Sequence, residues 1–159
     1  MSSFRKIIYS SLLFITACGF SPLYTGNDPS RLIGQISIQE PNSQDEFIFY
    51  SRLVDRFVQA DDKYVLNYAI TSTKEDRALN FDGTAHRVEI FGSVSFSLKD
   101  KEKEIELLYD KEEMYLTYSN AGSTAAVLNA ERDTNRQLII LLADKVADRI
   151  SLTIVEENL

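Results

Sequence analysis

The fold is decided by residues 88–98, which read Val88-Glu89-Ile90-Phe91-Gly92-Ser93-Val94-Ser95-Phe96-Ser97-Leu98. The even positions carry an apolar residue or glycine, and four of the five odd positions carry a polar one. Because successive side chains of a strand point to opposite faces, this alternation predicts a strand with one dry and one wet face. Such a strand is typical of an antiparallel sheet that is covered on one side only.

Strands are also predicted on both sides of this stretch. Residues 63–73 alternate in the same way, and the polar residues 72–83 after them predict a long exposed loop. A charged turn at 100–102 leads into another strand over residues 104–118. The apolar positions of this strand shift from Ile105, Leu107 and Tyr109 to Met114, Leu116 and Tyr118. A change of phase by one residue predicts a bulge or break near residues 110–112.

A short first strand and two helices complete the pattern. Ile36 and Ile38 share one side of a strand within residues 32–39. From residue 45 on, apolar residues recur every three or four positions, which predicts an amphipathic helix capped at Ser43 or Asp45. They are Phe47, Tyr50, Leu53, Val54, Phe57 and Val58.

Residues 125–155 predict a second helix. Its expected apolar face consists of Leu128, Leu138, Leu142, Val146 and Ile150. Residues 130–137 are almost wholly polar. The sequence leaves open whether this part is merely solvated, projects beyond the core or meets a partner.

The order of elements is therefore β-α-β-β-β-α. It predicts an α+β fold in which two helices pack on one face of a four-stranded, mostly antiparallel sheet. A length of 159 residues without repeats fits one domain. With 44% hydrophobic residues the chain has enough apolar surface to bury a core.

Charge and residue counts exclude several classes of function. The net charge of -7 argues against a sequence-independent grip on nucleic acid, which needs a basic face. One histidine and one cysteine cannot form a Cys/His zinc cluster. We find no nucleophile paired with a base, no paired carboxylates typical of a pocket and no phosphate-binding glycines. We therefore expect no enzyme activity, no catalytic residue, no metal and no cofactor, with His86 on the surface or an edge strand.

The first eighteen residues have the pattern of a processed export signal. Arg5 and Lys6 precede an uncharged stretch at 7–17, which is too short to span a bilayer as a helix. The last four residues, Ile15-Thr16-Ala17-Cys18, resemble the lipobox of bacterial lipoproteins. That resemblance implies removal of residues 1–17 and lipid attachment at Cys18, giving stable membrane anchoring. The alternative is a buried structural cysteine after an ordinary secretory signal.

The expected mature protein begins at Cys18. Residues 18–31 predict an extended tether, and residues 32–159 a single domain. Loss of Arg5 and Lys6 leaves 24 acidic and 15 basic residues, a net charge of -9. By the lipoprotein resemblance, Gly19 in place of an inner-membrane retention aspartate implies localisation to the outer membrane.

Two motifs resemble the LptE family of lipopolysaccharide-assembly lipoproteins. Residues 18–24, Cys-Gly-Phe-Ser-Pro-Leu-Tyr, match the start of mature chains in that family, except that Thr25 stands before Gly26. Residues 129–133, Asn-Ala-Glu-Arg-Asp, are similar to a segment early in the last helix of the family. The expected β-α-β-β-β-α order agrees with the family's fold.

The resemblance implies a non-enzymatic outer-membrane lipoprotein, anchored on the periplasmic side. It would plug and stabilise the LptD β-barrel and assist lipopolysaccharide transport. In the family, basic residues are associated with binding lipopolysaccharide phosphates, which makes Lys74, Arg77 and Arg87 candidates for lipopolysaccharide or barrel contact. The acidic mature chain argues against direct lipopolysaccharide binding, and a plain solvated loop is the alternative for these residues.

Two other functions remain open at this point. The chain could be a periplasm-facing lipoprotein that binds an unrelated protein or ligand on the open sheet face. There, Tyr109, Tyr115 and Tyr118 are the tyrosines we expect to be exposed. An anchored hydrolase is the third hypothesis, and it would require a role for His86.

Overall fold

The computed structural model describes residues 36–57, 63–79 and 85–156, without the side chains of 77–79, 85–86 and 155–156. It has two helices and four strands in the predicted order. They are β1 (Ile36–Ile38), α3 (Gln44–Arg56), β2 (Tyr64–Leu79), β3 (Ala85–Asp100), β4 (Ile105–Ser119) and α4 (Thr124–Glu156). The predicted α+β class is therefore confirmed.

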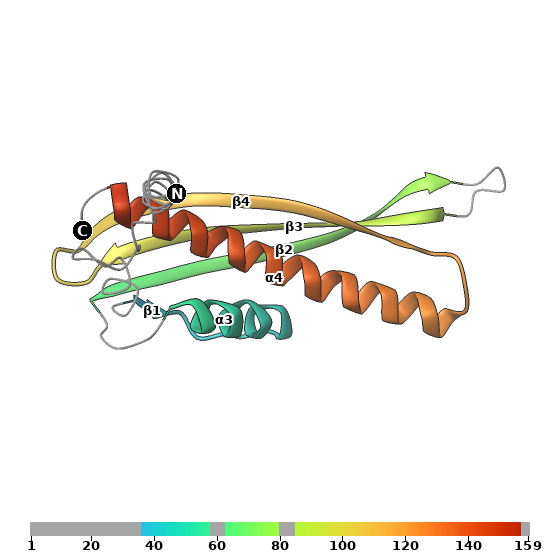
Figure 1. Ribbon diagram of the computed structural model, residues 1–159, viewed down its shortest axis with the longest axis horizontal. Coiled ribbons are helices and arrows are strands. Elements are labelled where there is room, and N and C mark those ends of the chain that lie inside the picture. Colours follow the sequence, from blue (N-terminus) through green and yellow to red (C-terminus); the bar gives the residue numbers. More distant parts are fainter. Residues whose placement is uncertain (1–35, 58–62, 80–84, 157–159) are drawn as a thin grey trace, which may run out of the picture.

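The sheet follows chain order, β1-β2-β3-β4. β1 pairs parallel with the start of β2, and the other neighbours are antiparallel. Figure 1 shows that β2, β3 and β4 are long and twisted, with α4 lying diagonally along one face and the shorter α3 beside it. Ion pairs from Arg52 to Asp144 and from Arg56 to Asp148 show that the two helices run parallel to each other.

The core lies between the helices and one face of the sheet. On β3, the helix-facing positions are buried, as the alternation predicts: Val88, Ile90, Gly92, Val94, Phe96 and Leu98. From α4, Leu138, Leu142, Val146 and Ile150 are each 0% exposed. Gly92 lets α4 approach closely, since a Cβ there would lie 2.9 Å from a methyl carbon of both Leu138 and Leu142.

The predicted loop at residues 72–83 is wrong over most of its length. β2 continues to Leu79 and pairs with β3 as far as the partners Leu79 and Ala85, with register shifts near Asp76 and Ala78. Residues 71–76 are all exposed. These side chains therefore remain largely exposed while the backbone hydrogen-bonds to β3, so polarity here does not signal a loop.

The predicted bulge in this strand is present, but it lies earlier in β4 than residues 110–112. β4 pairs with β3 through this segment, and the register shift lies between Leu98 and Lys99, opposite residues 106–108. Asp110 and Glu112 occupy helix-facing positions, where Arg149 and Lys145 of α4 bind them at 2.7 Å each. The apolar pattern changes phase at this shift, because Ile105 pairs with the buried Asp100 and Leu108 pairs with the buried Leu98.

The β3–β4 turn is organised by Asp100, whose side chain is buried. Its Oδ1 accepts hydrogen bonds from the backbone N–H groups of Glu102 at 2.9 Å and Lys103 at 3.0 Å. The N–H of Lys103 is the main cause that lowers the pKa of this carboxyl. Glu104 completes the turn with a φ of 56°, in the left-handed region.

The helix boundaries agree with the sequence, but the exposed residues differ in part. Ser43 caps α3 by accepting a hydrogen bond from the N–H of Glu46 at 3.2 Å. Phe47 is 60% exposed, whereas Phe49, two residues later, is buried in the core. Leu128 of α4 is 47% exposed. These two apolar positions were wrongly assigned because periodicity identifies a helix face but not where its packing partner begins or ends.

Candidate functional surface

The first half of α4 meets the sheet through polar contacts. From Thr124 to Gln137 its described side chains are exposed or half-buried, and Leu138 is the first buried one. Glu131 and Asn135 each bond to residues of the sheet. The segment 130–137 therefore lies along the sheet mainly through polar contacts, while Val127 and Ala130 pack against the edge of the apolar core.

Glu131 is the centre of one polar network. Its Oε1 lies 2.9 Å from Nζ of Lys74 on β2, and its Oε2 accepts a hydrogen bond from the hydroxyl of Tyr118 on β4 at 3.1 Å. The hydrogen bond from Lys74 is the main cause that lowers the pKa of Glu131, and the same contact raises the pKa of Lys74. Burial, and then the bond to Glu131, raises the pKa of Tyr118.

Asn135, one turn further along α4, holds a second network. Its Oδ1 accepts a hydrogen bond from the hydroxyl of Ser72 on β2 at 3.3 Å, and its Nδ2 donates to Oδ1 of Asp45 at 2.9 Å. Asp45 lies in the first turn of α3. A single amide thus connects the sheet and both helices.

The structure does not gather the predicted basic residues into one patch. Lys74 pairs in register with the buried Ile90 and contacts Glu131, so it faces the helices. Arg87 precedes the buried Val88 and is exposed, so it lies on the open face. Arg77 belongs to β2, but its side chain is outside the described residues. Lys74 and Arg87 could therefore not share one small ligand on a single face.

Two further basic residues on α4 were missed by the sequence reasoning. Arg132 and Arg136 are both exposed, and their spacing of four residues places them on the same side of the helix. The positive charge of Arg132 contributes to the lowered pKa of Glu131. The sequence could have identified Arg132 as a candidate, because it belongs to the Asn-Ala-Glu-Arg-Asp motif at residues 129–133.

Neither of the described helices lies on the opposite face of the sheet (Figure 1). Tyr109 is 70% exposed and Tyr115 is 63% exposed, as expected, while Phe91, the ladder partner of Tyr115, is 36% exposed. The prediction that Tyr118 is exposed is wrong: it faces the helices, and only 7% of it is accessible. Hydroxyl side chains fill much of the remaining open face, at Thr71, Thr73, Ser93, Ser95 and Ser97.

Further predictions lie beyond the described part of the chain. Cys18 and the side chain of His86 both belong to the parts that are not described. No helix within the described ranges has the length and hydropathy needed to cross a bilayer. Among those same residues, no group of three or more metal-ligating side chains comes together.

The same fold occurs in solved bacterial lipoproteins. A lipoprotein of Caulobacter crescentus has a TM-score of 0.65 and 18% identity, covering 81% of this chain and 96% of its own. Rare lipoprotein B of Shewanella oneidensis has a TM-score of 0.59 and 20% identity, covering 79% and 98%. A minor lipoprotein of Acinetobacter baumannii has a TM-score of 0.54 and 19% identity, covering 74% and 88%. No curated protein matches the chain.

The fold therefore defines a small α+β domain of the type found in these lipoproteins. Residues 33–150 match the family described as LptE: Lipopolysaccharide-assembly, and the chain belongs to this family. It is a family of non-enzymatic lipopolysaccharide-assembly lipoproteins associated with the outer membrane. The match begins after the predicted lipidation motif, so attachment of lipid at Cys18 remains a prediction.

Proposed function

We propose that this protein is an outer-membrane lipoprotein, anchored through Cys18 on the periplasmic side, that plugs the LptD β-barrel and assists lipopolysaccharide transport. The observation that carries the proposal is the match to the lipopolysaccharide-assembly family over residues 33–150. The fold supports it, since the described helices α3 and α4 lie on one face of an elongated sheet and leave its other face open within the described residues (Figure 1).

The chemistry of the bare face suits a polar enclosure. The interior of a transmembrane β-barrel is polar and often wet. The open sheet face offers hydroxyl groups at Thr71, Ser93 and Ser95, with tyrosine rings at Tyr109 and Tyr115. Such a surface can exchange hydrogen bonds with a polar wall without burying a large apolar area.

For lipopolysaccharide, the basic side chains of α4 are the stronger candidates. Arg132 and Arg136 are exposed on the polar half of the helix, and Lys74 is 52% exposed beside Glu131. Guanidinium groups bind phosphate oxygens with two parallel hydrogen bonds, and an ammonium group adds a point charge. We propose that these three residues bind lipopolysaccharide phosphates, whereas Arg87 on the open face contacts the barrel.

Pull-down of the native protein from detergent-solubilised outer membrane tests the plug assignment. We expect a large β-barrel to co-purify in stoichiometric amount. A Cys18→Ala variant should lose the lipid, as measured by incorporation of labelled palmitate. If the barrel is produced together with this variant, it should still co-purify with it in detergent. Recovery of an acylated protein without any barrel would instead favour a periplasmic partner of another kind.

Binding to purified lipopolysaccharide tests the phosphate site separately. The Arg132→Ala/Arg136→Ala variant should bind several-fold more weakly, because two phosphate contacts are lost. Arg87→Ala is the matched control on the opposite face, and its affinity should equal that of the wild type. A loss of affinity that occurs only in Arg87→Ala would show instead that lipopolysaccharide binds on the open face.

A further inference from the structure

Parts of the sheet border are protected against pairing with another strand. At the start of β2, the N–H of Gln39 donates to the carbonyl of Leu66 at 2.9 Å, directly after β1. The outer half of β2 carries consecutive charged residues from Lys74 to Asp76. On β4, residues 110–113 are all charged, and two of them bind α4. Charged side chains on edge strands oppose strand-to-strand association.

Residues 114–119 of β4 lack this protection. They read Met-Tyr-Leu-Thr-Tyr-Ser, six residues without charge, proline or glycine and with high β propensity. β4 is the last strand of the sheet, and among the described elements it pairs only with β3. Its outer edge therefore presents backbone N–H and C=O groups next to side chains that favour strand pairing.

We propose that this edge pairs antiparallel with the same edge of a second copy of the chain, around a two-fold axis at Leu116. In this register Tyr115 lies opposite Thr117 of the second copy, and Met114 lies opposite Tyr118. The inference goes beyond the proposed function, because it concerns the protein when it is free of its barrel.

The charges of β4 favour a register that is centred on the uncharged segment, and Leu116 lies in the middle of that segment. With the axis at Leu116, Glu113 lies opposite Ser119 of the second copy, and no like charges face each other. An axis at Lys111, Glu112 or Glu113 would place that residue opposite its own copy, which destabilises an antiparallel pair. The uncharged segment is therefore the part of β4 that can pair with itself.

The geometry also limits the assembly to two copies. An interface that uses the same surface on both subunits closes on itself. Once two copies pair through this edge, neither of them offers it to a third copy. The wall of a closed β-barrel has no free strand edge to offer here. A second copy of this chain supplies the matching edge.

Sedimentation equilibrium of the full-length protein, in density-matched detergent and over a range of concentrations, tests the proposal. The Tyr115→Glu/Thr117→Glu variant would place two pairs of carboxylates face to face across the axis. The Tyr115→Glu/Thr117→Lys variant would instead place each carboxylate opposite an ammonium group. Tyr109→Glu/Lys111→Gln is the matched control, because it changes the net charge of the same strand by the same amount outside the proposed interface.

We expect the wild type and the Glu/Lys variant to form dimers. The double-Glu variant should dissociate roughly tenfold more readily, and the control should resemble the wild type. A wild type that stays monomeric at every concentration would overturn the proposal. So would a double-Glu variant that dimerises normally, or a Glu/Lys variant as weak as the double-Glu one.

Discussion

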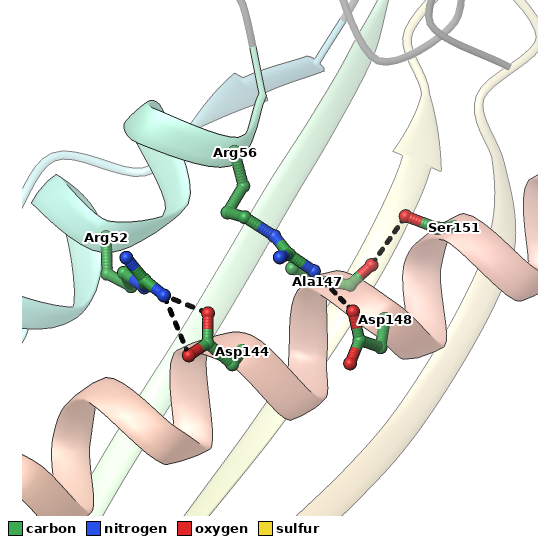
Figure 2. Close-up of polar contacts among 6 residues, drawn as sticks. All are labelled: Arg52, Arg56, Asp144, Ala147, Asp148 and Ser151. Carbon is green, nitrogen blue, oxygen red and sulfur yellow. Dashed lines mark hydrogen bonds and ion pairs between the residues drawn. The ribbon is translucent and has the colours of Figure 1, made fainter. Parts of the chain in front are cut away.

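Arg52 of α3 and Asp144 of α4 form a two-point ion pair, with Nε to Oδ1 at 2.9 Å and Nη2 to Oδ2 at 3.0 Å. Four residues further along both helices, Arg56 meets Asp148 (Figure 2). Equal spacing on both helices is what parallel axes require, since one helical turn advances each by 3.6 residues. The dipoles of parallel helices point the same way, and these ion pairs help to hold α3 against α4.

The two pairs should differ in strength. Asp144 is 25% exposed and binds through both carboxylate oxygens, whereas Asp148 is 66% exposed and binds through one. Exposed single contacts contribute little, and paired parallel hydrogen bonds contribute more. Double-mutant cycles by urea denaturation should therefore give a larger coupling energy for Arg52→Ala with Asp144→Ala than for Arg56→Ala with Asp148→Ala. Equal couplings would contradict this assignment.

Truncation of the α4 core should be costly, and truncation of its first half should not. Leu142 is 0% exposed and Leu128 is 47% exposed. Leu142→Ala should lower the free energy of unfolding by about 2–5 kcal/mol through lost burial and a cavity. Leu128→Ala should change it by less than about 0.5 kcal/mol. Chemical denaturation checks both, and a large effect at Leu128 would mean that the core extends further along α4.

The contact between Gly92 and α4 should tolerate no large side chain. A Cβ added at Gly92 would lie 2.9 Å from a methyl carbon of both Leu138 and Leu142, at the movable ends of these side chains. Gly92→Leu should therefore destabilise the fold by about 1–3 kcal/mol through overpacking. Ser93→Leu, one residue later and on the open face, is the control and should have a much smaller effect on the thermal midpoint.

Acid should weaken the attachment of β4 to α4. The N–H of Lys111 and then the Arg149 side chain lower the pKa of Asp110. A carboxyl whose pKa is lower in the folded state adds stability above its unfolded pKa, and this is lost as pH falls through the folded value. The window therefore lies below about pH 4, the unfolded pKa of aspartate.

Asp110→Asn should consequently be less stable than the wild type at neutral pH and lose less stability on acidification. Thermal unfolding of both proteins between about pH 6 and pH 3 measures this difference around the usual pKa of aspartate. Asp148→Asn, at a mostly exposed site, is the control. Parallel curves for Asp110→Asn and the wild type would contradict the role of Asp110.

The network around Glu131 should order the first half of α4. Glu131→Gln keeps the size of the side chain but removes the charge that binds Lys74. We expect faster amide hydrogen exchange in residues 124–137, since no side chain there is buried. Exchange around Leu142 should stay unchanged, because apolar packing holds that part. Uniform acceleration along α4 would show that Glu131 supports the whole helix.

The sequence alone was sufficient to predict the helix and sheet layers of this protein. Alternation in residues 88–98 predicted β3 with its buried face, and the spacing of Leu138, Leu142 and Val146 predicted the packed half of α4. These elements are determined locally, because burying one face of a strand or helix requires apolar residues at a fixed period. The motifs at residues 18–24 and 129–133 pointed to the family that the chain matches.

Only the tertiary structure decided where polar residues lie. Residues 72–79 extend β2 because β3 supplies their hydrogen-bond partners. Asp110 faces the helices because Arg149 reaches it from α4. Lys74 and Arg87 lie on opposite faces of the sheet because register fixes the side to which each points. A polar side chain can lie in water or against a distant counter-ion, and its local sequence is the same in both cases.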